Sequence, residues 1–263
     1  MSGRNYRATG INLRRMHLGE ADLLLTVLTR EYGLVRAVAK GARKANARIG
    51  GRTELFVVND LQLYRGRTLD QVLSADSLRV FGGLGRDLGR LTAAQYLAEG
   101  VLQGATEGQP QVELYELFLE HLGRLERTAA AHLPARLVHG LYQLLAVSGV
   151  APEVYSCTVS HRPISAEPAA FSIEGGGLVA SECCASQPAG ALRRLDVEQV
   201  AALQLLADDE LAPASLEWSE LWVGLERLLR VYLEFHFERP IRSAQLLDLC
   251  FESDAVAAPV PPL

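Results

Sequence analysis

The chain has 263 residues, of which 49% are hydrophobic and 22% are charged. This is the composition of a globular protein, and the length suits one large domain or two smaller ones. No apolar run approaches the ~18 residues of a membrane-spanning helix. The opening segment MSGRNYRATG also lacks the basic and apolar regions of a signal peptide, so we expect a cytoplasmic protein with no membrane partner.

The formal charge of -5 conceals a difference between two parts of the chain. Residues 1–80 contain 14 Arg and Lys against 7 Asp and Glu, whereas the remainder contains 12 against 24. A split of this size indicates a polyanion-binding module joined to an acidic part that faces partner proteins. The alternative is an ordinary solvated surface of mixed charge.

Residues 5–80 have the pattern of β-strands. Alternating or short buried apolar runs follow one another with no helical period between them, and Gly10 is expected to mark a bulge in the first strand. Such a series predicts a small antiparallel barrel of the OB type, which closes on itself and leaves no open edge. The five predicted strands are YRATGINLRR, DLLLTVLT, LVRAVAKG, TELFVVNDLQLYRG and LDQVLSAD.

After Ser77 the apolar period changes from two to three or four, which predicts an all-helical body. Asp196 and Gln199 have the spacing of a capping box at the start of one helix. A central segment rich in Pro, Gly, Ser and Cys lacks a helical period, and the end of the chain has the composition of a disordered tail. The predicted fold is therefore α+β and multidomain. Its parts are an OB barrel at 1–80, helical segments at 81–150 and 191–252, an irregular insertion at 151–190 and a tail at 253–263.

The stretch LVRAVAKGARKANARIGGRTELF gathers positive charge at the end of the third predicted strand. Arg36 and Lys40 share parity and project from one face of that strand, and the loop after Gly41 adds further cations among small residues. A barrel with a basic groove is the geometry that tracks single-stranded nucleic acid, helped by aromatic rings on which bases stack. The aromatic candidates are Tyr6, Tyr32, Phe56 and Tyr64, although each alone is better explained as a residue of the core or its rim. The predicted DNA-binding residues are Arg36, Lys40, Arg43, Lys44, Arg48, Arg52, Arg65 and Arg67.

Motifs typical of enzymes are weak in this sequence. The segment GGLGRDLG at residues 82–89 resembles a phosphate-binding loop, but its spacing is G-x-G-x-x-x-G and no alternation of strands and helices surrounds it. We interpret it as a joint between barrel and helices. The run DDE at residues 208–210 fits a solvated loop better than a metal site. We therefore expect a binding protein that is not an enzyme.

The segment YRATGINLRRMHLGEADLLLTVLTREYGLVRAVAKGARK resembles the amino-terminal signature of the RecO family, bacterial recombination mediators with a strand, a GE-D turn and a basic loop in this order. The segments ELFVVNDLQLYRGRTLDQVLSAD, AAQYLAE, FSIEGGGLVASEC and YLEFHFERPIRSAQLL extend the resemblance over nearly the whole chain. The resemblance implies an OB barrel, a helical body and a small zinc-finger-like insertion. It also implies a nucleoid-associated role in DNA recombination, repair and the DNA damage response. That role is to bind and anneal single-stranded DNA and, with RecR, to help RecA load onto strands coated by single-strand binding protein.

The insertion departs from the family pattern, in which two C-x-x-C pairs supply four thiolates to a structural zinc. Here Cys157 is followed by Ser160, and Ala180 precedes Cys183, so only half of the thiolates remain. Adjacent cysteines rarely reach one tetrahedral ion without strain, and we expect neither a metal nor another cofactor. If zinc is bound, its ligands would be Cys157, His161, Cys183 and Cys184.

Two functions from different classes remain open. In the first, the barrel binds single-stranded DNA, with double-stranded DNA left open, and the helical body docks RecR and the carboxyl-terminal tail of single-strand binding protein. In the second, the chain is a protein-interaction scaffold whose basic barrel binds an acidic partner peptide instead of DNA. By resemblance, the partner peptide in the first case would lie against apolar helical faces beside Arg124, Arg127 and Arg136.

Overall fold

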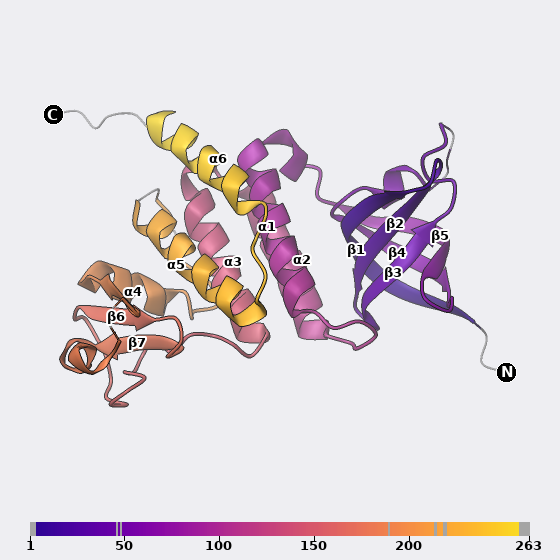
Figure 1. The fold of residues 1–263 in the computed structure, drawn as a ribbon. Coiled ribbons are helices and arrows are strands. Elements are labelled where there is room, and N and C mark those ends of the chain that lie inside the picture. Colours follow the sequence, from indigo (N-terminus) through magenta and orange to yellow (C-terminus); the bar gives the residue numbers. More distant parts are fainter. Residues whose placement is uncertain are drawn as a thin grey trace. The chain divides into compact units, whose positions relative to one another are not determined.

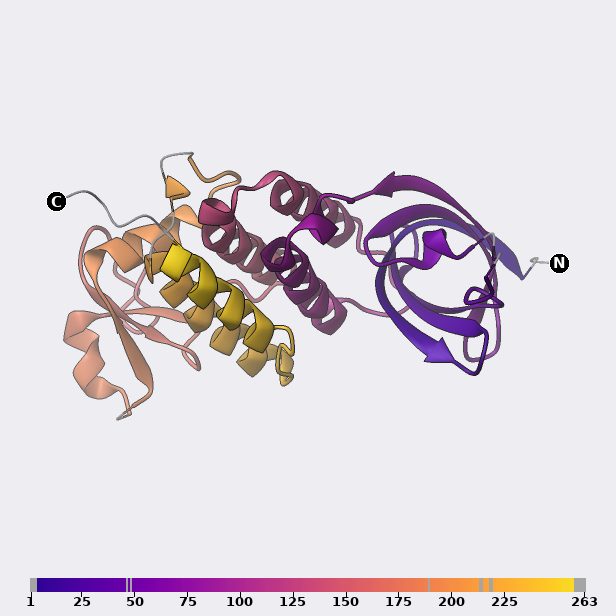
Figure 2. The same ribbon diagram turned by 90° about the horizontal axis from the view of Figure 1, so that it is seen from above.

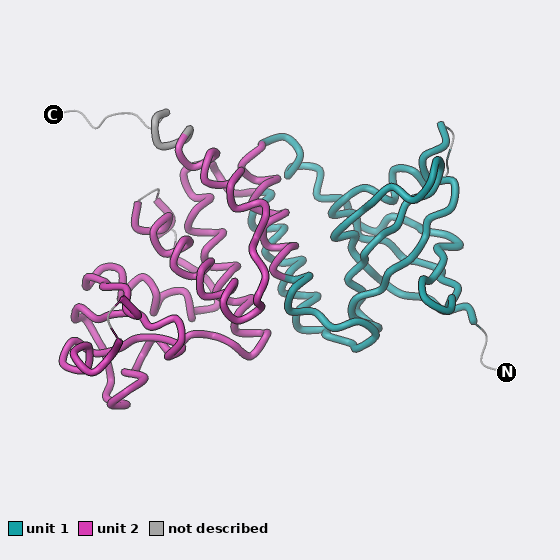
Figure 3. Tube along the Cα trace, viewed as in Figure 1, with its two compact units in different colours: residues 1–87, 101–126 teal, residues 88–100, 127–263 magenta. Residues whose placement is uncertain are grey.

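A computed structural model shows how the chain folds, and Figure 1 labels its helices and strands. Two compact units are distinguished in Figure 3, the first formed by residues 1–87 and 101–126 and the second by residues 88–100 and 127–263. No helix of the described part is long and apolar enough to cross a membrane. The structure describes residues 4–45, 47, 49–188, 190–212, 215–217 and 220–257, with the side chains of the last helix described to residue 252.

Five strands of the first unit form a closed barrel in the order β1-β2-β3-β5-β4, and their curvature into a ring is visible in Figure 2. Neighbouring strands are antiparallel except β3 and β5, which meet through a short parallel pairing that closes the ring. The predicted five-stranded, OB-like amino-terminal part is confirmed. The strands are β1 (Asn5–Leu18), β2 (Asp22–Thr29), β3 (Gly33–Ala39), β4 (Val57–Tyr64) and β5 (Asp70–Val80).

Alternate side chains of each strand fill the interior of the barrel, as the period of two requires. Leu25, Val27, Ala37 and Leu61 belong to this core, and each is at most 1% exposed. The core is built mainly from small and branched side chains, so the barrel is narrow and tightly filled.

The bulge of β1 does not lie at Gly10, where the sequence led us to expect it. The register against β2 shifts between Asn12 and Arg14 instead. Gly10 is needed for a different reason, because a Cβ atom there would lie only 2.6 Å from Cγ1 of Val27 on the neighbouring strand. The glycine therefore permits close packing, and the shift occurs three residues further on.

Helical residues complete the first unit, which includes the end of α1 (Leu88–Gly104) and most of α2 (Val112–Arg127). The loop between these helices joins the start of β3, where the backbone of Leu34 makes hydrogen bonds of 3.2 Å with both Thr106 and Gly108. The aromatic ring of Phe56 packs against that of Phe118 on α2, with 6.5 Å between ring centroids. The barrel and this helical segment consequently share one packed interior.

The second unit is a helical body, and this part of the prediction is also confirmed. Its helices α3 and α5 pack directly against each other. The predicted capping box is present at α4, where the Gln199 amide donates to Asp196 Oδ1 at 2.8 Å and the Asp196 amide donates back to Gln199 Oε1 at 3.1 Å. The backbone of α6 continues into the segment expected to be a tail, of which residues 258–263 lie outside the described part. The helices are α3 (Leu133–Val147), α4 (Val197–Leu205), α5 (Glu220–Phe237) and α6 (Ala244–Ala257).

Two strands of the predicted insertion, β6 and β7, belong to a three-stranded sheet in the order β7-β6-β8. The third strand, β8, lies beyond the predicted boundary at residue 190, in a segment expected to be helical. The central strand of this sheet contributes Phe171, which is fully buried and meets Tyr232 of α5 edge-on at 5.5 Å between ring centroids. This aromatic pair fixes the sheet to the helical body. The strands are β6 (Ala169–Ser172), β7 (Gly177–Ala180) and β8 (Leu192–Leu195).

Candidate nucleic-acid interface

A basic row crosses the outer face of β1, β2 and β3. Arg36 on β3 is exposed and lies opposite Thr26 on β2, which in turn lies opposite Arg14 on β1. Neither arginine side chain has a hydrogen bond or ion pair with another residue in the described part of the chain. Arg14 was missed from the sequence because only the register shows that the bulge after Asn12 moves it to the outer side.

An apolar row lies directly beside the basic one. The register places Met16 of β1, Leu24 of β2 and Val38 of β3 opposite one another. Met16 is 47% exposed, and the other two are half-buried. Bases and apolar peptide side chains both suit such a strip, whereas phosphates suit the neighbouring arginines.

The basic loop that follows β3 is anchored where it begins. Gly41 has a φ of +66°, and its amide donates to Oδ1 of Asp22 at 2.7 Å. Two residues later the amide of Arg43 donates to the carbonyl oxygen of Ala21 at 2.9 Å. The start of the loop is thus bound to the turn between β1 and β2.

Two buried asparagines anchor the other end of this loop. The side-chain amides of Asn12 and Asn59 both donate to the carbonyl oxygen of Arg52, at 2.7 Å and 2.9 Å. Both asparagine residues are 0% exposed. The loop therefore leaves and re-enters the barrel at fixed points.

The structure divides the predicted DNA-binding residues into groups. Arg36, Lys40, Lys44 and Arg67 are exposed, and their side chains make no hydrogen bond or ion pair with another described residue. Arg48 lies outside the described residues. Three others have structural contacts, namely Arg43 with the carbonyls of Gly19 and Glu20, Arg52 with Asp76 at 3.9 Å, and Arg65 with two tyrosine rings.

Arg65 belongs to an aromatic cluster at the start of β3 and not to the basic loop at its end. Its guanidinium lies 4.9 Å from the ring centroid of Tyr6 and 5.9 Å from that of Tyr32. The hydroxyl of Tyr6 donates to Asp70, and burial together with this hydrogen bond raises the pKa of Tyr6. A strand of the length of β3 spans about 20 Å, so Arg65 lies apart from the cations that follow this strand.

The aromatic candidates differ in accessibility. Tyr6 and Tyr32 are half-buried and meet edge-on at 4.8 Å between centroids, while the hydroxyl of Tyr64 accepts a hydrogen bond of 2.9 Å from Arg4. Phe56 is only 3% exposed, so it does not offer a ring face to a base. Its φ of 60° is unusual for a large side chain.

The predicted partner-binding residues are distributed over both units. Arg124 lies on α2 in the first unit and pairs with Glu120 at 2.6 Å. Arg127 and Arg136 belong to the second unit, where the former is exposed and the latter is half-buried.

The two weak enzyme motifs have structural roles. In the glycine-rich segment, the Gly83 amide donates to Oε1 of Glu126 at 2.8 Å, which connects the end of the barrel to α2. The acidic run at residues 208–210 is exposed, and the Asp208 carbonyl accepts hydrogen bonds from His139 and Gln143.

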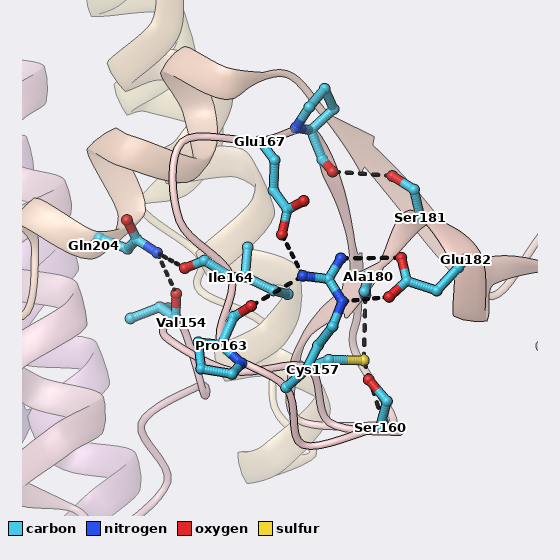
Figure 4. Close-up of polar contacts among 12 residues, drawn as sticks. Val154, Cys157, Ser160, Pro163, Ile164, Glu167, Ala180, Ser181, Glu182 and Gln204 are labelled. Carbon is cyan, nitrogen blue, oxygen red and sulfur yellow. Dashed lines mark hydrogen bonds and ion pairs between the residues drawn. The ribbon is translucent and has the colours of Figure 1, made fainter.

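The sulfur of Cys157 is the centre of a small hydrogen-bonded network in the insertion (Figure 4). It is fully buried and accepts backbone N–H groups from Val159 and Ser160, each at 3.4 Å, and from Ala180 at 3.3 Å. Burial raises the pKa of the Cys157 thiol, but these hydrogen bonds outweigh burial and lower it to about 6. The Cys184 thiol points to a different atom and donates to the Ala180 carbonyl at 3.5 Å.

An arginine connects the strands and loops around this cysteine. Arg162 donates to Glu167 Oε1 at 2.7 Å, to the carbonyl of Pro163 at 3.0 Å and to both carboxylate oxygens of Glu182 (Figure 4). Hydrogen bonds from Arg162 lower the pKa of Glu182 to about 2. The loop before β6 and the residues after β7 are thus joined by ion pairs.

The donor groups of the insertion do not fit a structural zinc ion. Among the described residues, no group of three or more His, Cys, Asp or Glu side chains is arranged to hold a metal. The ligands considered from the sequence, Cys157, His161, Cys183 and Cys184, are therefore not assembled into a tetrahedral set. The Cys157 sulfur is occupied by backbone donors, and Arg162 supplies the cross-link.

Comparison with known proteins gives two family matches. The family described as Recombination protein O N terminal matches residues 1–81, and the family described as Recombination protein O C terminal matches residues 85–245. These matches cover the barrel and most of the helical body.

Full-length relatives are also similar to the chain. It is 72% identical to the DNA repair protein RecO of Gloeobacter violaceus, with all of both chains covered. It is 48% identical to the DNA repair protein RecO of Synechococcus sp. (strain JA-3-3Ab), with all of this chain and 90% of the relative covered. The similarity to the DNA repair protein RecO of Acaryochloris marina is 45% identity over 94% of this chain and 96% of the relative. The similarity therefore extends over barrel, insertion and helices alike.

Proposed function

The chain belongs to the RecO family of DNA repair proteins, and from this premise we propose that it is a recombination mediator that binds single-stranded DNA along the outer face of its barrel. Its role lies in recombinational repair. In the proposed mechanism the protein anneals complementary strands and, together with RecR, helps RecA load. The helical body docks RecR and the tail of single-strand binding protein.

The distribution of unpaired cations supports this proposal most directly. Arg7, Arg15 and Arg30 of the same unit each form an ion pair with a carboxylate, so their charge is largely compensated. Arg14 and Arg36, by contrast, have no such partner among the described residues. Lys40 and Lys44 extend this uncompensated charge beyond the end of β3. An exposed row of uncompensated charge gains more from phosphates than from water and counterions.

Annealing on this surface requires no bond chemistry. Contacts to phosphates neutralise the repulsion between two strands while the bases remain free to pair. The apolar row of Met16, Leu24 and Val38 gives bases a surface on which to rest without reading their sequence. The activity therefore needs no catalytic residue or cofactor.

The proposal is tested by titrating labelled single-stranded DNA with the full chain at several salt concentrations. If about five phosphates are neutralised, the plot of log affinity against log salt has a slope of about -3 to -4. The triple variant R14Q/R36Q/K40Q should make that slope shallower by about 2. The variant R7Q/R15Q/R30Q removes the same formal charge from paired positions and is the matched control, with an expected change in slope below about 0.5. Equal effects of the two variants, or no salt dependence in the natural protein, would contradict DNA binding at this face.

An acidic peptide is the second candidate ligand of this face, because a basic row beside an apolar row also suits a peptide with acidic and apolar side chains. A peptide with the sequence of the tail of single-strand binding protein distinguishes the two ligands. If R14Q/R36Q/K40Q loses peptide binding and keeps DNA binding, the scaffold function replaces the DNA-binding function at the barrel.

A further inference from the structure

The turn between β1 and β2 is bound to the start of the basic loop by several hydrogen bonds. Asp22 accepts from the Gly41 amide at 2.7 Å, and Ala21 accepts from the Arg43 amide at 2.9 Å. The Arg43 guanidinium adds a bond of 2.9 Å to the carbonyl of Glu20. Of these acceptors, the Asp22 carboxylate is the one that a side-chain substitution can remove.

The carboxylate of Asp22 acts where the backbone leaves β3. Gly41 adopts the left-handed conformation with a φ of +66°, and its carbonyl accepts from the Lys44 amide at 3.1 Å to close a tight turn. Hydrogen bonds to an ionised acceptor are stronger than those between neutral groups. The bond from Gly41 to Asp22 therefore holds the turn in the conformation that exposes Lys40 and Lys44 on either side of the glycine.

We propose that Asp22 is a positioning residue for DNA binding, which holds the Lys40–Lys44 turn ready for phosphates although its own charge repels them. The inference rests on the proposed function of the basic face. A loop that is held before binding loses less conformational freedom when DNA arrives. The carboxylate of Asp22 is therefore needed for tight binding of DNA, although DNA is itself negatively charged.

The two effects of Asp22 have opposite signs, which makes the inference testable. If Asp22 acted only through its charge, its removal would strengthen DNA binding by reducing repulsion. If it positions the turn, removal weakens binding because the turn must be ordered at the cost of affinity. Glu20 is the matched control, because it lies in the turn between β1 and β2, two residues before Asp22. Its carboxylate is exposed and makes no hydrogen bond or ion pair with another described residue.

The first experiment measures the affinity of the full chain for labelled single-stranded DNA at fixed salt. Asp22→Ala should weaken binding about 3- to 10-fold, whereas Glu20→Ala should leave it equal or slightly stronger. Asp22→Asn keeps an acceptor oxygen without the charge and should bind within about 2-fold of the natural protein or more tightly. Asp22→Glu keeps the charge but moves the oxygen, and should weaken binding as alanine does. If Asp22→Ala does not fold, Asp22→Glu is used in its place.

The inference is overturned if the affinity of Asp22→Ala for DNA equals that of Glu20→Ala. It is also overturned if Asp22→Asn loses as much affinity as Asp22→Ala does.

A second experiment measures, in the absence of DNA, how readily the backbone of the Lys40–Lys44 turn opens. Limited digestion with trypsin cleaves after Lys40, Arg43 and Lys44 only when this backbone opens. Asp22→Ala and Asp22→Glu should be cut there several-fold faster than the natural protein, Asp22→Asn and Glu20→Ala. Equal rates would refute the positioning role even if DNA binding had changed. If the natural protein bound no DNA while digestion followed the expected order, the proposed function would fail and the positioning of the turn would stand.

Discussion

At the scale of single residues, the buried asparagines of the barrel show how polar side chains can decide the course of a loop. Asn12 and Asn59 stand on neighbouring strands and converge on one carbonyl oxygen, that of Arg52. A buried carbonyl without a hydrogen bond would lower the stability of the fold. The chain therefore re-enters the barrel at the point where these two amides can donate to the Arg52 carbonyl. The two asparagines thereby fix the position at which the basic loop ends.

Replacing Asn59 by alanine should therefore lower the free energy of unfolding by about 1–3 kcal/mol, since it removes a donor to the Arg52 carbonyl from a buried position. Urea unfolding of the full chain measures the change. Asn5→Ala is the control, because Asn5 is exposed at the start of β1, and it should change stability by less than about 0.5 kcal/mol. Equal stability of N59A and N5A would show that this amide does not hold the loop.

The sequence predicted residue roles as far as they follow from local spacing. Parity along the third strand placed Arg36 on the outer face correctly, and the capping pair at Asp196 follows from spacing alone. Arg14 escaped prediction because its side depends on a bulge whose place is set by packing between two strands. The contacts of Arg65 with two tyrosine rings were not foreseen, because these aromatic partners are distant in sequence.

At the scale of elements, the insertion is held together by hydrogen bonds and ion pairs between its own loops and strands. Its cysteine sulfur is satisfied by backbone donors, and the ion pairs of Arg162 connect the loop that carries it to the end of β7. Gln204 of α4 adds hydrogen bonds of 2.9 Å to the carbonyls of Val154 and Ile164 (Figure 4). Composition predicted an irregular segment here, but these contacts join residues far apart in the sequence, and composition does not predict such contacts.

The ion pair of Glu182 should make the insertion sensitive to acid. Its pKa is about 2 in the folded chain against an ordinary value of 4.5, so the folded state favours the ionised form. The resulting stabilisation is fully present above about pH 4.5 and is lost as the pH falls towards 2. Hydrogen exchange of the insertion as a function of pH should show this loss in the natural protein and not in Glu182→Gln.

The matched control for this experiment is Glu174→Gln, an exposed carboxylate of the same insertion, which should keep the acid response of the natural protein. A metal chelator at neutral pH should leave the exchange of the insertion unchanged, because the cross-link is an ion pair. An effect of the chelator, or about one zinc ion per purified chain, would contradict a metal-free insertion.

At the scale of the whole molecule, the boundary of the compact unit around the barrel differs from the boundary of the positively charged part of the sequence. The excess of positive charge is confined to residues 1–80, but the compact unit around the barrel also contains residues 101–126. These residues cover Phe56 through Phe118 and supply the main-chain partners of Leu34. Sequence periodicity separates strands from helices well, yet it cannot show which helices a barrel needs.

A fragment of residues 1–80 should consequently be less stable than a fragment of residues 1–126, because the shorter one exposes Phe56 and leaves the start of β3 without its partners. Thermal unfolding followed by circular dichroism should give the shorter fragment a midpoint lower by about 10 °C or no cooperative transition. Both fragments contain every cation of the basic row, so the longer one should retain the salt-dependent DNA binding of the full chain. A cooperative transition at the same temperature in both would show that the barrel is independent of α2.

Lys40 and Lys44, which stand on either side of the left-handed Gly41, are the only two lysines of the chain. An amine-selective reagent would therefore modify side chains at this single turn and leave the surrounding arginines untouched. A fluorophore or crosslinker could be attached at the proposed binding face without any engineering. If a bound ligand slowed this labelling, the slower rate would show that the ligand covers Lys40 and Lys44 in the natural protein.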